Sequence, residues 1–277
     1  MNQLTVALAQ IPITVTDKSQ NINTMEKTAE NARKKNIELL IFSELVLTGY
    51  VCRDLFYQLA EPLSGPTVKS LQRAAQQNGL AIIFGMPTKG NLKGIIYNSS
   101  VLIDEGGDIY SYNKIFLPTH SVFDEKRYFL CGQEICCFET GRFKIGLTIC
   151  YDIYFPEIYR VLALEWADIV AVACISASLS TRQDYFEVLI KARAIENGNF
   201  HIFVNRFGTE DGFQFWGGSR IVSPNGDLLA KWKYYDEELV VSTIDLDDLE
   251  KVRPFIPTIR DLRPEIVDLL RERSHKV

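Results

Sequence analysis

The order of secondary-structure patterns constrains the fold most strongly, because the same order occurs twice along the 277 residues. In the first half, short apolar runs typical of strands alternate with segments whose apolar residues recur at helical spacing. Two more strand-like runs, joined by a turn signal at residues 105–107, predict an antiparallel hairpin. The second half repeats these units, with a hairpin around residues 224–226.

We expect strands at residues 4–10, 38–42, 81–86, 96–103, 108–112, 143–149, 169–174, 201–205, 220–222, 228–232 and 239–244. We expect helices at residues 21–35, 67–78, 156–165 and 185–197. Two pseudo-equivalent halves, each with a mixed sheet covered by helices on one face, predict an α/β fold whose sheets meet face to face. The result is a four-layer α-β-β-α sandwich, although periodicity alone also fits a single doubly wound sheet.

The domain organisation follows from the lack of a linker in the sequence. Residues 1–277 are expected to form a single domain. Beyond Asp245 the pattern weakens into a charged segment with three prolines. Residues 246–277 are therefore expected to form a C-terminal arm that packs on a neighbour or on the body of the protein.

Composition and charge exclude several classes of protein. The chain is 47% apolar and 23% charged, with a net charge of −5, as is ordinary for a soluble globular protein. No basic stripe or polybasic cluster indicates nucleic acid or an anionic membrane. Residues 161–179 are the most apolar long stretch, but Glu165 and Asp168 interrupt them, and no leader precedes the first strand. We expect a cytoplasmic protein that binds neither nucleic acid nor membrane.

The six cysteines form no CxxC pair, and the three histidines lie far apart. Neither a disulfide framework nor a zinc site is therefore expected. The sequence has no glycine-rich phosphate-binding loop, so use of ATP is not indicated. We expect reduced thiols, no metal and no cofactor.

Two segments place charged side chains next to strand ends. In residues 39–50 a buried strand runs into Glu44, at the kind of position where α/β active sites collect; the alternative is a carboxylate at a helix start. In residues 110–132 Lys114 follows a strand and Glu125 lies in a loop rich in aromatic residues. The alternative for Lys114 is a solvated surface charge.

A third segment, residues 143–160, contains the candidate nucleophile. Its strand delivers Cys150 to a bend just before a helix, which is the geometry of a nucleophile elbow. Cysteine is also a common buried apolar residue, so this segment alone does not decide. No histidine is placed beside Cys150, which argues against a Cys-His dyad.

Together the three segments fit one reaction. A lysine ammonium lowers the pKa of a neighbouring thiol, and a carboxylate can take the thiol proton and pass it to a leaving amine. The lysine and a backbone amide can hold the oxyanion of a tetrahedral intermediate.

On these motifs the chain resembles the nitrilase superfamily of carbon–nitrogen hydrolases, from the first strand to about Asp245. That resemblance implies a catalytic Glu-Lys-Cys triad of Glu44, Lys114 and Cys150. It also implies that Glu125 is the second glutamate, which orders the lysine and the substrate. A homodimer packed through outer helices and the C-terminal arm is a further implication.

Within the superfamily, ELVLTGYVCRDL and LPTHSVFDEKRYF are similar to the glutaminase domain of glutamine-dependent NAD synthetases. That similarity implies amide-substrate contacts by Tyr50, Phe123 and Ser176, and a substrate-carboxylate contact by Arg182. The sequence ends at Val277 without a synthetase domain, which argues against NAD synthesis by this chain alone. Residues 205–229 also resemble stand-alone amidases and N-carbamoyl amine hydrolases; they either contact substrate or form a hairpin that closes the sandwich.

We therefore expect cofactor-independent hydrolysis of a small carboxamide through a Cys150 thioester, with release of ammonia; the similarity to the glutaminase domain adds glutamine-like amides to the candidate substrates. Glu44 is the expected general base, and Lys114 with the amide of Tyr151 is expected to hold the oxyanion. One alternative is an N-carbamoyl amine or amino-acid hydrolase of the β-ureidopropionase kind. Another is a glutaminase-like subunit that supplies ammonia to a partner synthetase.

Overall fold

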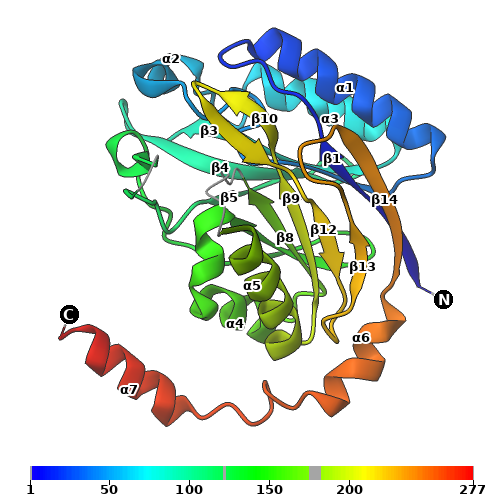
Figure 1. Cartoon of the computed structure of the whole chain (residues 1–277), viewed down its shortest axis with the longest axis vertical. Helices are drawn as coiled ribbons and strands as arrows, with labels where there is room; N and C mark the ends of the chain where they lie inside the picture. The colour runs from blue at the N-terminus through cyan, green and yellow to red at the C-terminus, as the bar shows by residue number, and fades with distance from the viewer. Residues whose placement is uncertain (1, 121–122, 175–181, 277) are drawn as a thin grey trace.

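Two six-stranded sheets packed face to face form the centre of the protein, and helices cover both outer faces (Figure 1). The computed structural model describes residues 2–120, 123–174 and 182–276, and of Arg182 only the backbone. The expected four-layer α-β-β-α sandwich is confirmed.

The first sheet contains strands from both ends of the chain. Its order is β14 (Glu238–Asp245), β1 (Gln3–Gln10), β2 (Leu39–Phe42), β3 (Ala81–Lys89), β4 (Ile96–Ile103) and β5 (Ile109–Asn113). β1, β2 and β3 are parallel, whereas β14, β4 and β5 each join an antiparallel pair. β14 thus departs from the expected division of the chain into halves. It lies beside β1, whose outer edge would otherwise leave unpaired backbone groups.

The second sheet has the order β13 (Leu228–Lys231), β12 (Arg220–Val222), β9 (Phe200–Asn205), β8 (Ile169–Cys174), β7 (Lys144–Ile149) and β6 (Cys137–Glu139). β7, β8 and β9 are parallel. A separate hairpin consists of β10 (Phe207–Glu210) and β11 (Phe213–Trp216). β6, β10 and β11 are too short for their alternation to be seen in the sequence.

Helices α1 (Lys18–Lys34) and α3 (Pro66–Asn78) cover the first sheet, and α4 (Pro156–Leu164) and α5 (Arg182–Asn197) cover the second (Figure 1). These four expected helices and the eleven expected strands are confirmed, with ends that differ by at most three residues. The remaining helices are α2 (Phe56–Leu59), α6 (Asp247–Val252), α7 (Pro264–Ser274) and the 3₁₀ turns η1 (Arg53–Leu55), η2 (Glu125–Arg127), η3 (Cys150–Tyr154) and η4 (Arg253–Phe255).

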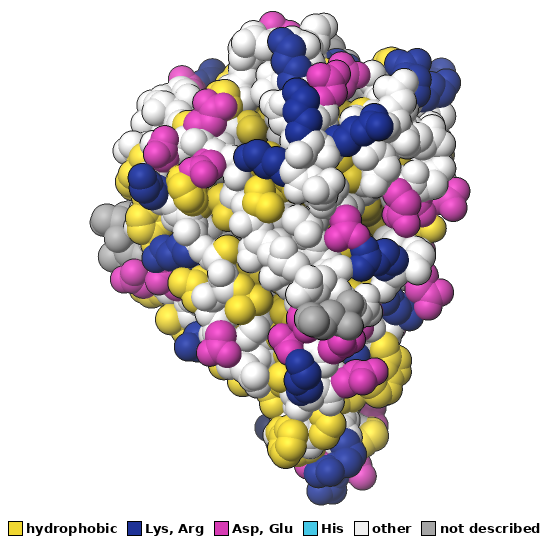
Figure 2. Space-filling view, turned by 90° about the vertical axis from the view of Figure 1, so that its right-hand side faces the viewer, with side chains coloured by type: hydrophobic (Ala, Val, Ile, Leu, Met, Phe, Trp, Pro, Cys, Tyr) yellow, Lys and Arg dark blue, Asp and Glu magenta, His cyan; other side chains and the backbone are white. Residues whose placement is uncertain are grey.

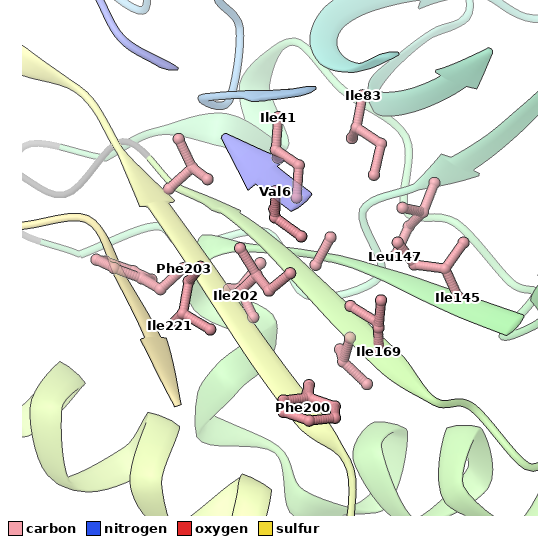
Figure 3. Packing of buried hydrophobic residues seen from close by; sticks show 14 of the residues in the cluster. Val6, Ile41, Ile83, Ile145, Leu147, Ile169, Phe200, Ile202, Phe203 and Ile221 are labelled. Carbon is pink, nitrogen blue, oxygen red and sulfur yellow. The ribbon is translucent and has the colours of Figure 1, made fainter. Parts of the chain in front are cut away.

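Strand β1 shows how one strand serves two layers. Leu4, Val6 and Leu8 point into the core between the sheets, while Ala7 and Ala9 pack under the outer helices. This alternation follows the two-residue period of a strand. Figure 3 shows side chains from both sheets meeting in the inner core, among them Val6, Ile41, Ile83, Ile145, Leu147 and Ile202.

The C-terminal segment leaves the sandwich after β14. Leu249 and Val252 of α6 are buried, whereas α7 lies away from the sheets with apolar side chains such as Ile266 and Leu270 exposed (Figure 1). Packing of residues 246–277 on a neighbour stays a prediction.

The outer surface carries both signs of charge. Acidic and basic side chains are interspersed over the face shown in Figure 2. Of the helices in the described ranges, none is both long and apolar enough to traverse a bilayer.

The close approach of β3 to the end of β2 leads to a first prediction. A Cβ at Gly85 would lie 2.3 Å from the backbone nitrogen of Leu45 and 2.8 Å from Cα of Glu44. Gly85→Ala must therefore displace the backbone that carries Glu44. We expect it to lower the free energy of unfolding, measured in urea, by about 1–3 kcal/mol. Gly141→Ala is the control, because the nearest atom to its Cβ is 3.5 Å away; equal losses in both variants would contradict the prediction.

Candidate active site

Glu44 and Lys114 meet because their strands end at the same edge of the first sheet. β2 and β3 are parallel, and two successive antiparallel pairings give β5 the same direction. Glu44 lies two residues beyond β2, and Lys114 directly follows β5. Both side chains are fully buried. The sheet topology therefore places a carboxylate and an ammonium side by side.

Lys114 lies between two carboxylates. Its Nζ is 2.8 Å from Oε1 of Glu44 and 2.8 Å from Oε1 of Glu125. The side-chain amide of Asn98, on β4, donates to Oε1 of Glu44 at 2.7 Å and to Oε2 of Glu125 at 3.5 Å. Hydrogen-bonded pairing of this kind offsets the cost of burying charge. The four residues form one connected polar cluster.

Burial and pairing shift the pKa values in this cluster. Burial alone would lower the pKa of Lys114, but Glu125 and Glu44 outweigh it and raise the pKa well above its usual value. Burial raises the pKa of Glu125 to about 7, against the opposing effect of Lys114. Lys114 therefore keeps its positive charge. Glu125 titrates near neutral pH.

Cys150 lies on a strained turn at the end of β7. Its φ is +45°, which few residues other than glycine adopt, and η3 begins at this residue. The side chain is 6% exposed, and Cys150 is one of the groups that raise the pKa of Lys114. This is the strand-to-helix elbow that the sequence predicts.

Asp152 fixes the elbow against the strand end that carries Lys114. Its carboxylate accepts hydrogen bonds from the amides of Ile149 at 2.9 Å and Phe116 at 3.0 Å, and from the Tyr112 hydroxyl at 2.8 Å. Tyr112 and Phe116 flank Lys114 on either side. One buried carboxylate thus ties the nucleophile segment to the lysine segment.

Three of the expected substrate-binding residues line two neighbouring cavities. Tyr50 and Glu125 line a cavity of about 190 Å³, and Phe123, Tyr151 and Cys150 line a smaller one of about 20 Å³. The Tyr50 and Phe123 rings meet edge to face at 5.5 Å, so their contact lies where the cavities adjoin. Ser176 and the side chain of Arg182 lie outside the described residues.

The structure corrects one sequence-based expectation. His120 was expected to lie apart from Cys150, but it lines the same cavity, and its ring centroid is 5.1 Å from that of Tyr151. The path of the chain from Lys114 to His120 brings it there, which sequence separation could not show. Its presence does not alter the contacts between Lys114 and the carboxylates.

Asn98 and Asp152 are functional-site residues that the sequence analysis missed. A signal existed for each. Asn98 begins a polar triplet inside an otherwise apolar strand, and Asp152 follows Cys150 by two residues. Both side chains are fully buried.

Within the described ranges, no three His, Cys, Asp or Glu side chains are grouped as a metal site requires.

The chain belongs to the carbon-nitrogen hydrolase family, whose model matches residues 5–254. It is an enzyme of this class and fits the nitrilase superfamily. A probable nitrilase of Schizosaccharomyces pombe is 32% identical over 252 residues, which are 90% of this chain and 91% of that protein.

Two further matches show the range of the family. A glutamine-dependent NAD(+) synthetase of Aquifex aeolicus is 31% identical over 90% of this chain, but the match covers only 44% of that protein. A structure of an amidase variant from Nesterenkonia sp. AN1 superposes with a TM-score of 0.83 at 27% identity, covering 96% of this chain and 95% of that one. In that amidase, the acetamide moiety of fluoroacetamide is attached covalently to the active-site cysteine.

Asp152 gives a stability prediction. Asp152→Ala leaves two buried donors and one half-buried donor without their acceptor, and each buried orphaned donor costs about 1–3 kcal/mol. We expect a loss of more than about 3 kcal/mol in the free energy of unfolding, whereas Tyr112→Phe, which removes a single donor, should cost about 1 kcal/mol. Urea denaturation measures both, and a loss in Asp152→Ala no larger than that in Tyr112→Phe would contradict the account.

Tyr50 gives a pH prediction. Its hydroxyl donates to Oε1 of Glu125 at 3.1 Å, and this bond lowers the pKa of Glu125 against the larger effect of burial. Tyr50→Phe removes the bond, so the pKa of Glu125 rises. Activity that needs ionised Glu125 is present above this pKa and is lost as the pH falls through it. We expect the acid limb of kcat/KM to move to higher pH, with Tyr57→Phe, an exposed tyrosine, as the unchanged control.

Proposed function

We propose that the protein hydrolyses the C–N bond of a small carboxamide through a thioester on Cys150. The observation that carries the proposal is the buried Lys114 ammonium, which is paired with Glu44 and Glu125 and coupled electrostatically to Cys150. A thiol beside a fixed positive charge and a carboxylate is suited to nucleophilic attack.

In the acylation step, Glu44 takes the proton from the Cys150 thiol, and the sulfur attacks the amide carbonyl carbon. Lys114 and the backbone amide of Tyr151 hold the oxyanion of the tetrahedral intermediate. The C–N bond breaks as Glu44 passes the proton to the leaving nitrogen, and ammonia departs. The acyl group remains on Cys150 as a thioester.

In the deacylation step, Glu44 takes a proton from water, and the resulting hydroxide attacks the thioester carbonyl. The C–S bond then breaks, the sulfur recovers the proton, and the carboxylic acid leaves. Glu125 transfers no proton in this scheme. Its contacts with Lys114 and the Tyr50 hydroxyl give it the role of orienting the lysine and the substrate amide. We also propose that Phe123, Ser176 and Arg182 contact the substrate.

The amidase from Nesterenkonia sp. AN1 supports the cysteine mechanism, because its active-site cysteine accepts an acetamide moiety. The NAD(+) synthetase match supports a second candidate, a glutaminase-like subunit that delivers ammonia to a partner. We further propose a homodimer, which the exposed apolar side chains of α7 support.

The test is ammonia release from glutamine, other ω-amides, short aliphatic amides and N-carbamoyl amino acids. We expect one group to be turned over and Cys150→Ala and Glu44→Gln to lose that turnover at least about a thousandfold while remaining folded. Cys136→Ser is the control: it changes a cysteine outside the Lys114 cluster and should keep near-native activity.

The outcomes separate the candidates. Carbon dioxide released together with ammonia from N-carbamoyl substrates would assign the chain to N-carbamoyl amine hydrolysis. Glutamine turnover that requires an added synthetase would favour the partner-dependent subunit. Near-native turnover in Cys150→Ala would refute the thioester mechanism.

A further inference from the structure

The β10–β11 hairpin brings another buried carboxylate toward the active site. Glu210, the last residue of β10, is 2% exposed and forms an ion pair with Arg206, which is equally buried. The hairpin belongs to neither six-stranded sheet. Its position therefore depends on side-chain contacts and on single backbone bonds, such as that from the amide of Tyr235 to the carbonyl of Trp216, rather than on a sheet ladder.

Glu210 binds the backbone of the segment that carries Tyr50. Its Oε2 accepts from the amide of Tyr50 at 2.9 Å and from the amide of Val51 at 2.8 Å. Gly49 has a φ of +78°, and a Cβ there would lie 3.1 Å from Oε1 of Glu210. The glycine therefore lets the chain turn so that two successive amides point at one carboxylate. Charge-assisted bonds of this kind are stronger than neutral ones.

The chain of contacts continues from Tyr50 into the catalytic cluster. The Tyr50 hydroxyl donates to Oε1 of Glu125, the same oxygen that lies 2.8 Å from Nζ of Lys114. Phe215 of β11 packs against the Tyr50 and Phe123 rings, so the hairpin also contacts the ring of Tyr50. Both the backbone and the ring of Tyr50 are thus held by the hairpin.

We propose that Glu210 is a positioning residue for the hydrolytic reaction: it fixes Tyr50 so that the Tyr50 hydroxyl stays on Glu125 and keeps that carboxylate on Lys114. The inference rests on the proposed function, because it explains what keeps Glu125 oriented for that reaction. It also gives residues 205–229 a role: within this segment the β10–β11 hairpin holds Tyr50 in place.

A neighbouring ion pair does not explain the same arrangement. Arg53 and Asp211 also join the two segments, at 2.7 Å, but their side chains are 73% and 53% exposed. Exposed pairs contribute little to stability, because water and salt screen their attraction. The buried Glu210 contacts are therefore the ones that set the position of Tyr50.

The experiment is a double-mutant cycle on kcat/KM with Glu210→Gln and Tyr50→Phe, run on the amide that the wild type hydrolyses. Glu210→Gln should lower kcat/KM on the order of tenfold to a hundredfold and move the acid limb of its pH profile upward, as Tyr50→Phe does. In the Tyr50→Phe background, Glu210→Gln should have almost no further effect, because both changes act through one hydroxyl.

Glu210→Asp serves if Glu210→Gln does not fold. It keeps the charge beside Arg206 but withdraws the carboxylate by one methylene from the two amides, so the same upward shift of the acid limb is expected. Thr209→Ala, an exposed neighbour on β10, is the matched control and should match the wild type.

Additive effects of Glu210→Gln and Tyr50→Phe, or an unshifted acid limb in folded Glu210 variants, would overturn the positioning role. Failure of the proposed function looks different, because the wild type itself would then show no turnover that depends on Cys150.

Discussion

The structure depends on one buried cluster in which a lysine lies between two glutamates. A lone buried charge costs several kcal/mol even after relaxation, so Lys114, Glu44 and Glu125 are stable only together. Each comes from a different segment: one beyond β2, one after β5 and one in the following 3₁₀ turn. Asn98 donates a hydrogen bond to each of the two carboxylates and so satisfies part of their remaining capacity to accept hydrogen bonds. The requirement to pair these charges fixes how the three segments meet.

The sandwich also couples the two halves of the chain at this point. The lysine and both glutamates belong to the first half, whereas Cys150 ends a strand of the second sheet. Asp152 bonds to residues on both sides of Lys114, so the elbow cannot shift without the strand end that it faces. The position of the nucleophile, Cys150, relative to the base, Glu44, is therefore set by how the two sheets pack together. The two cavities beside this arrangement are lined largely by residues outside the six-stranded sheets.

The sequence predicted the layers and the polar centre because both depend on local patterns. Strand and helix periodicity repeats in the two halves, and Glu44, Lys114 and Cys150 each follow a strand, which is visible in one dimension. Asn98, Asp152 and Glu210 were missed because their partners lie 54, 36 and 160 residues away. The prediction that no histidine lies near Cys150 was wrong for a similar reason, because the position of His120 depends on the path of a loop. The place of β14 could not be predicted either, because an edge strand pairs by geometry and not by sequence order.

The pairing of β14 with β1 has a consequence for the protein during synthesis. β14 is made long after β1, its antiparallel partner, and the amide of Leu246 closes this edge by donating to the carbonyl of Asn2. Until then the nascent first sheet presents an open strand edge, the kind of surface at which chains associate wrongly. Completion of the sheet that carries Glu44 and Lys114 therefore waits until the strands of the second sheet have been made, so a ribosome stalled before β14 holds an aggregation-prone intermediate rather than a finished half.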